Sequence, residues 1–214
     1  MPEKNINFNQ GSAYTGLLIN NEDRVGEGDF LRVTSPITEE LVAEFRGASL
    51  QQVDEAVSSA KAAFESGVWK NAEFRKTVLL KFAALIEENR DQLMDALISE
   101  IGSPINLKAN HTDTPAAFVR WFAEGATRDR TRHLGFNNTH TAVSMVAYRP
   151  VGVVAAISAF NYPLLIGVTK IGAALAAGCT TVLLSSPLAP LAVLLLGDLV
   201  RQAGFPAGVV NIIA

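Results

Sequence analysis

Apolar residues recur at helical spacing through the middle of the chain, from residue 49 to about residue 134. Steps of three and four residues predict a helix that begins after Ser49, its expected N-cap. A second helical stretch is expected over residues 72–101 with an interruption at 89–91, and a third over residues 115–130. These helices define a helical part at residues 49–134. Before it, short apolar pieces separated by Gly, Asn and Asp predict an extended or hairpin lead-in at residues 1–48.

The last third of the chain alternates between strand and helix patterns. The expected strands lie at residues 142–149, 151–157, 180–184 and 209–213, and the expected helices at 163–178 and 189–203. Alternation of this kind is typical of a parallel sheet with right-handed crossovers. We therefore predict an α/β fold with a doubly wound parallel sheet. Residues 151–214 form a βαβαβ unit, after an arm at 135–150. Because the chain stops directly after an apolar strand, we expect this sheet to be incomplete.

One long apolar stretch also raises the possibility of a membrane segment. Lys170 is the single charged residue between Val151 and Gly197. A spanning helix needs about 20 unbroken apolar residues, whereas Gly178 and Pro187 help to break this stretch into shorter pieces. Parallel strands that are covered on both faces have continuous apolar runs of this length. A buried parallel sheet is the favoured interpretation, with no membrane partner.

Composition and charge narrow the function classes. The 214 residues are 49% hydrophobic and 18% charged, which excludes a disordered or collagen-like chain. The net charge of -3 and the pI near 5.6 give no reason to expect a nucleic-acid partner. A single cysteine cannot form an internal disulfide, and the polar start at Met1–Asn7 lacks the apolar core of a secretory signal. We expect a cytoplasmic protein.

The segment Ile157–Pro163 is the first candidate site. It lies at the carboxyl end of an expected strand, just before a helix, where open α/β sheets bind their ligands. The amide of Asn161 can donate hydrogen bonds without carrying a charge, so it could stabilise an oxyanion on a substrate carbonyl. The alternative is that Asn161 closes a turn or caps the helix that Pro163 opens.

Several segments, in their order and spacing, resemble the amino-terminal part of an aldehyde dehydrogenase. The matching segments are Leu17–Asn20, Gly67–Trp69, Arg75, Glu100–Pro104, Pro150–Val154, Phe160–Pro163, Lys170–Gly178 and Ala203–Asn211. The resemblance implies a Rossmann-like cofactor domain that binds NAD or NADP. It also implies an enzyme that oxidises an aldehyde to a carboxylic acid.

The resemblance also assigns roles to individual residues. Asn161 matches the oxyanion-stabilising asparagine of the family, and Phe160 matches an aromatic residue of the cofactor groove. The other residues expected to bind the cofactor are Ile157, Ser158, Ala159, Leu184 and Ser186.

This sequence departs from the family pattern at the cofactor turn. The family has Lys-Pro-Ser-Glu where this chain has Leu184-Ser185-Ser186-Pro187, so two side chains that hold the adenosine ribose are replaced. The family's nucleophilic cysteine and general base would follow Ala214. We therefore expect a truncated chain that oxidises no aldehyde by itself. The alternative is a non-catalytic remnant or interaction module of the same fold.

Other reactive side chains have simpler interpretations. Cys179 follows an expected helix end in an apolar setting, so a buried small side chain is favoured over a nucleophile. Lys170 is either a structural lysine or a catalytic one, and the structural role is favoured. His111, His133 and His140 lack metal-ligand spacing and are expected to be solvent-exposed or capping. We therefore expect no metal site.

The arm at residues 135–150 is the basis for a prediction about oligomeric state. Met145–Arg149 resembles the family's bridging strand, which packs against another subunit. Because an unpaired strand edge favours association, we expect a homo-oligomer or a self-associating chain. The alternative is that the arm folds back, pairs with Val151–Ile157 and leaves a monomer.

Overall fold

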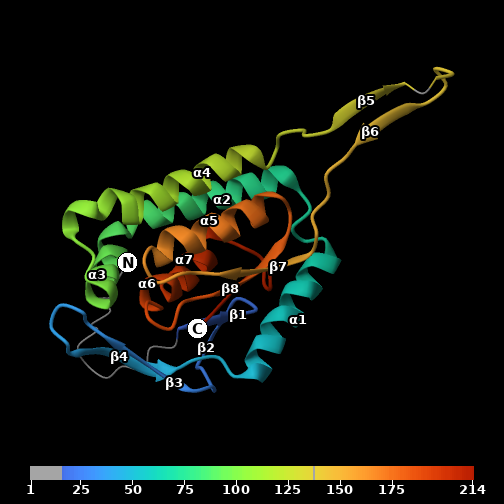
Figure 1. Cartoon of the computed structure of the whole chain (residues 1–214). Helices are drawn as coiled ribbons and strands as arrows, with labels where there is room; N and C mark the ends of the chain where they lie inside the picture. The colour runs from blue at the N-terminus through green and yellow to red at the C-terminus, as the bar shows by residue number, and fades with distance from the viewer. Residues whose placement is uncertain (1–15, 137) are drawn as a thin grey trace.

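The computed structural model describes residues 16–136 and 138–214. Residues 1–15 of the predicted lead-in, with the polar start at Met1–Asn7, and Asn137 of the predicted arm lie outside these residues. The fold is α/β, as predicted, and its main sheet has five strands in the order β2-β1-β9-β8-β7 (Figure 1). The parallel part comprises β7 (Val153–Ile157), β8 (Thr180–Leu184) and β9 (Val210–Ile213).

The crossovers between the parallel strands are helical. They comprise α5 (Pro163–Ala176), α6 (Leu191–Leu194) and α7 (Leu196–Ala203). Helix α7 ends at Gly204, whose φ of 91° is left-handed, as the sequence predicts for a glycine stop. The long apolar run of the sequence is thus divided among strands and short helices. Among the described residues, none of the helices has the length and apolar character needed to cross a membrane.

The lead-in forms two hairpins, and one of them joins the main sheet. Strands β1 (Leu17–Ile19) and β2 (Glu22–Arg24) are antiparallel, and β1 also pairs with β9. The sequence prediction did not include these strands in the main sheet. All three β1 residues are buried, because β1 lies between β2 and β9. The second hairpin consists of β3 (Phe30–Thr34) and β4 (Leu41–Arg46).

The helices of the middle segment follow the predicted pattern with two exceptions. They are α1 (Leu50–Ser66), α2 (Ala72–Glu88), α3 (Arg90–Ile101) and α4 (Thr114–Gly125). Ser49 caps α1 in a reciprocal capping box with Gln52. A short 3-10 helix η1 (Ile105–Leu107) and a π-helical turn η2 (Ala109–Asp113) precede α4 and were not predicted. Helix α4 also ends before the predicted residue 130.

The sheet lies between two helical layers (Figure 1). Helices α5 and α7 pack on one face and are covered in turn by α2 and α4, whereas α1 packs on the other face. Helix α1 contacts the amino end of β8, where the Thr180 hydroxyl donates to the Ala60 carbonyl at 2.8 Å. The carboxyl ends of β7 and β8 on this face are therefore left accessible.

A two-stranded arm projects from the body (Figure 1). It consists of β5 (Arg132–Phe136) and β6 (Val143–Val146), which are antiparallel to each other. Gly135 and Phe136 end β5 and pair with Ser144 and Val143 of β6. The arm does not fold back onto Val151–Ile157, since β5 and β6 form a separate two-stranded sheet and neither is paired with β7.

Candidate functional site

The predicted site residues gather at the carboxyl ends of β7 and β8. Ile157 lies opposite Leu184 in the parallel register, and the Ser158 N–H donates to the Leu184 carbonyl at 2.9 Å. Register neighbours point to the same face of a sheet. The exposed fraction is 63% for Ile157, 53% for Phe160 and 38% for Leu184. Together these side chains form an exposed apolar surface at one sheet edge.

Ser158 shapes the turn that leaves β7. Its side chain is buried, and its hydroxyl donates to the Pro163 carbonyl at 2.6 Å. This bond ties the end of the strand to the first turn of α5. The Ser158 hydroxyl is therefore engaged within the protein, whereas the neighbouring Ala159 and Phe160 are exposed.

Ser186 holds the turn that leaves β8. Its hydroxyl accepts from the Leu188 N–H at 3.3 Å, and its carbonyl accepts from the Ala189 N–H at 3.1 Å. Ser186 and Ala189 also form an isolated β-bridge. The turn is therefore closed on itself, with Leu184 before it and the exposed Pro187 within it.

The amide of Asn161 is free to contact a ligand. The residue is exposed, and its side chain makes no hydrogen bond with any other described residue. Helix α5 has Tyr162 at its N-cap position and no side-chain cap. Asn161 therefore does not cap the helix, so the capping part of the alternative is wrong, and the residue lies in the bend that precedes α5.

His111 is a residue near the site that the sequence prediction placed wrongly. It was expected to be solvent-exposed or capping, but it is 4% exposed and its ring stacks on Tyr162 with 4.6 Å between ring centroids. Burial lowers the pKa of His111 below its usual value. The ring belongs to η2, and the polar sequence of this turn gives no periodic signal that would reveal its burial. The stack fixes the residue that follows Asn161.

Glu100 anchors the chain beyond the Ser186 turn. Its carboxylate accepts from the backbone N–H groups of Leu191 at 2.6 Å and Ala192 at 3.1 Å. Burial raises the pKa of this carboxyl group to about 7, although the two backbone hydrogen bonds act in the opposite direction. The sequence analysis assigned no role to Glu100. The sole sequence feature that could have drawn attention to it was its place in the segment Glu100–Pro104.

The remaining reactive side chains do not converge on this edge. Cys179 is buried, and its backbone N–H donates to the Ala174 carbonyl. Lys170 is exposed and forms no ion pair with another described residue. Within residues 16–136 and 138–214, no three His, Cys, Asp or Glu side chains gather in a way that could hold a metal ion.

The side chains exposed at this edge are apolar rather than polar. Ile157, Phe160 and Leu184 offer an apolar surface that suits the faces of planar rings, as ligand sites generally do. The side chains of Leu184 and Pro187 have no polar atom that could bind a ribose hydroxyl. This edge therefore offers apolar surface but no polar side-chain atom at positions 184 and 187.

Comparison with known proteins gives one consistent result. The sequence profile described as "Aldehyde dehydrogenase family" matches residues 24–214. Over 187 residues the chain is 40% identical to the aminoacetaldehyde dehydrogenase of Pseudomonas aeruginosa. This match covers 84% of this chain and 36% of the Pseudomonas protein. It is 33% identical over 202 residues to the NADP/NAD-dependent aldehyde dehydrogenase PuuC of Escherichia coli, covering 92% of this chain and 40% of PuuC.

The fold agrees with solved structures over the same portion. An NAD+ complex of the aldehyde dehydrogenase of Bacillus cereus superposes with a TM-score of 0.88 at 32% identity. The match covers 93% of this chain and 41% of the Bacillus chain. The chain thus spans about two fifths of the length of the relatives it resembles.

Proposed function

Since the chain belongs to the aldehyde dehydrogenase family over residues 24–214, we propose that it contributes the first part of an NAD(P)-dependent aldehyde-oxidising site. The carboxyl ends of β7 and β8 bind NAD or NADP, and Asn161 stabilises the oxyanion that forms when an aldehyde carbonyl is attacked. NAD(P), when bound, accepts the hydride that leaves the aldehyde carbon.

The observation that carries the proposal is the convergence at the sheet edge. Two turns that are distant in sequence are joined by the backbone bond from Ser158 to Leu184, and together they expose Phe160 beside Asn161. Open α/β sheets bind ligands at this edge. The Asn161 amide is exposed and has no hydrogen-bond partner among the described residues, as a group that donates to a substrate oxygen requires.

The same surface predicts weak cofactor binding. Each charge-assisted hydrogen bond to a ligand contributes substantially to affinity, and Leu184 supplies none. We expect NAD to bind the 214-residue chain with a dissociation constant of about 1 mM, measured by calorimetry. Leu184→Lys restores a donor at the family's lysine position and should strengthen binding about tenfold.

The matched control for this experiment is Leu188→Lys. Leu188 lies in the same turn and is exposed, so this variant adds the same charge at a position that the proposal does not use. Its effect should be much smaller than that of Leu184→Lys. Equal strengthening by both variants would mean that NAD responds to net charge alone and not to a built site.

A second candidate function is a non-catalytic interaction module of the same fold. The replacement of the family's lysine and glutamate by Leu184 and Pro187 favours it. If neither NAD nor NADP saturates the chain or the Leu184→Lys variant at millimolar concentration, this second function is supported and the first is wrong.

A further inference from the structure

A cavity of about 690 Å³ opens where the arm joins the body. Its walls come from the last turns of α4 and α5, from Arg75 of α2 and from the two segments that lead into and out of the arm. We call it the arm-base cavity. It lies toward the amino end of β7, whereas the proposed cofactor residues lie at the carboxyl end of that strand.

The lining of the arm-base cavity is strongly cationic. It includes four arginines, and Asp129 is its single acidic residue among those described. None of the four arginines forms an ion pair with another described residue. This excess of positive charge is local, because the chain as a whole has a net charge of -3. The four arginines are Arg75, Arg128, Arg130 and Arg149.

The helix ends offset only part of this charge. Helices α4 and α5 both end at the cavity, and each C-terminus carries about half a negative charge. With Asp129, these groups leave about two positive charges uncompensated in the cavity. Such a balance favours the binding of an anion.

One of the arginines is held in place by hydrogen bonds, and a second lies close to the end of α4. Arg75 is 9% exposed, and its guanidinium donates to the carbonyls of Ala176, Trp69 and Lys70 through Nε and Nη1. Its Nη2 has no acceptor among the described residues. Arg130 folds back over the end of α4, where its Nη2 lies 3.4 Å from the position that a Cβ on Gly125 would occupy.

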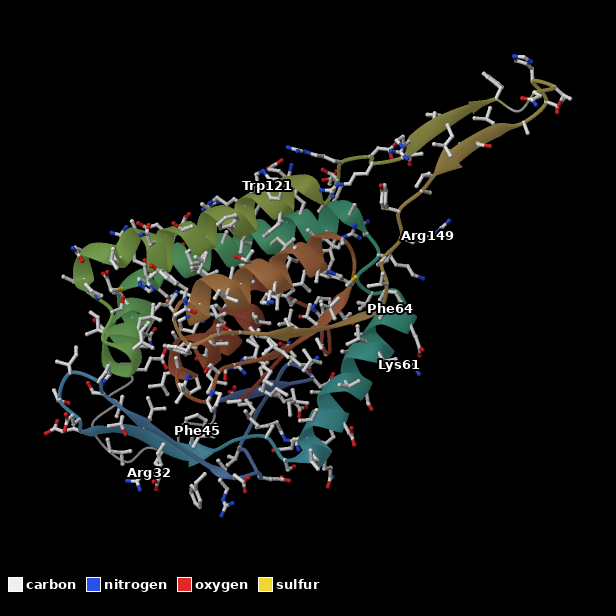
Figure 2. All side chains as sticks on the ribbon, viewed as in Figure 1. Arg32, Phe45, Lys61, Phe64, Trp121 and Arg149 are labelled. Carbon is white, nitrogen blue, oxygen red and sulfur yellow. The ribbon has the colours of Figure 1, made fainter. Side chains whose placement is uncertain are left out.

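The other lining residues suit a small ligand with a planar part. Figure 2 shows Trp121 on α4 and Arg149 at the base of the arm. Trp121 and Tyr148 line the same cavity and are largely exposed. The volume lies within the range of small-molecule sites, roughly 300–1,000 Å³.

We propose that the arm-base cavity binds a small multivalent oxyanion through its arginine side chains. Phosphate and carboxylate oxygens are the groups that guanidinium forks bind in pairs. A ligand with two or more such groups can contact the fixed Arg75 and the exposed arginines of the arm at the same time.

The test titrates pyrophosphate and, separately, citrate into the 214-residue chain at low salt. Of the two tryptophans, Trp69 is 1% exposed in the core, so a change in fluorescence reports on Trp121 in the cavity. We expect a saturable change with at least one of the two anions, matched by one binding event in calorimetry. Added salt should weaken this binding because the contacts are ionic.

Two variants distinguish anion binding in the cavity from a general effect of positive charge on the arm. Arg149→Gln should weaken binding about tenfold, because it removes a charge-assisted pair of hydrogen bonds. Arg132→Gln is the control, since Arg132 is also an exposed arginine of the arm but does not line the cavity. The proposal is overturned if neither anion saturates the signal, or if Arg132→Gln weakens binding as much as Arg149→Gln does.

Discussion

Single residues at the site edge are held by buried polar bonds, and Glu100 is the clearest case. Its folded-state pKa of about 7 lies above the ordinary value of 4.5, so the folded chain holds this proton more tightly than the unfolded chain does. The stabilisation is complete below about pH 4.5 and is lost as the pH rises through about 7. Glu100 should therefore make the chain more stable at pH 5 than at pH 8.

We expect this difference in the free energy of unfolding to be about 1–3 kcal/mol. Denaturant unfolding at the two pH values measures it. Glu100→Gln should flatten the pH dependence, because the group no longer titrates. Glu88→Gln, which changes an exposed glutamate of α2, should keep the slope of the unaltered chain. If Glu100→Gln also keeps that slope, the buried carboxyl is not its source.

At the scale of elements, the close approach of α1 to the turn before β9 sets the position of the helix. Gly208 has a φ of 78°, and a Cβ on it would lie 2.5 Å from the Ser59 carbonyl oxygen. Gly208→Ala should lower the free energy of unfolding by about 2–4 kcal/mol, because backbone strain and a clash with backbone act together. Thermal or denaturant unfolding measures the loss.

Gly204→Ala is the matched control for the clash. Gly204 has a similar φ of 91°, but nothing lies within 4 Å of its added Cβ. This variant should cost about 1 kcal/mol, from backbone strain alone. Equal losses in the two variants would show that the approach of α1 is not tight.

Sequence pattern predicted the elements with strong local signals. The capping Ser49, the break near Asn89 and the glycine stop at Gly204 each act within a few residues, and the structure has all three. Pairing between distant segments was not predictable in the same way. Strand β1 is three residues long, and its place beside β9 depends on a contact between Leu18 and Ile212.

The meeting of the two candidate turns was predictable, because it follows from the direction of the parallel strands. Residues 157–161 and 184–186 had to meet, because parallel strands end at one edge. The supporting contacts of His111 and Glu100 were missed. Each joins segments far apart in sequence. His111 lies outside the predicted helices and strands, and the helical pattern around Glu100 does not reveal that this polar side chain is buried. Tertiary packing alone determines such contacts.

At the scale of the whole molecule, the arm is the most exposed apolar feature of the described residues. Its strands bury almost nothing, and the exposed apolar side chains are Leu134, Phe136, Val143, Met145 and Tyr148. Exposed apolar surface on a paired ribbon favours association with other molecules. We therefore predict that the isolated chain self-associates through the arm.

Light scattering coupled to size exclusion tests this prediction over a range of concentrations. Phe136→Glu together with Met145→Glu should shift the chain toward monomer. Leu50→Glu is the control, because Leu50 is 86% exposed on α1 and lies outside the arm. A monomer at every concentration in the unaltered chain would contradict the prediction.

The central claim is that the edge formed by β7 and β8 binds NAD(P), and backbone amide chemical shifts test it most directly. Titration of the labelled chain with NAD should move the amides of Ser158, Phe160, Ser185 and Ser186 more than those of the β3–β4 hairpin. These four amides lie in the two turns that carry the exposed surface. Saturable shifts confined to these turns would support the claim. No shifts there at millimolar NAD, or shifts that gather at the arm base instead, would contradict it.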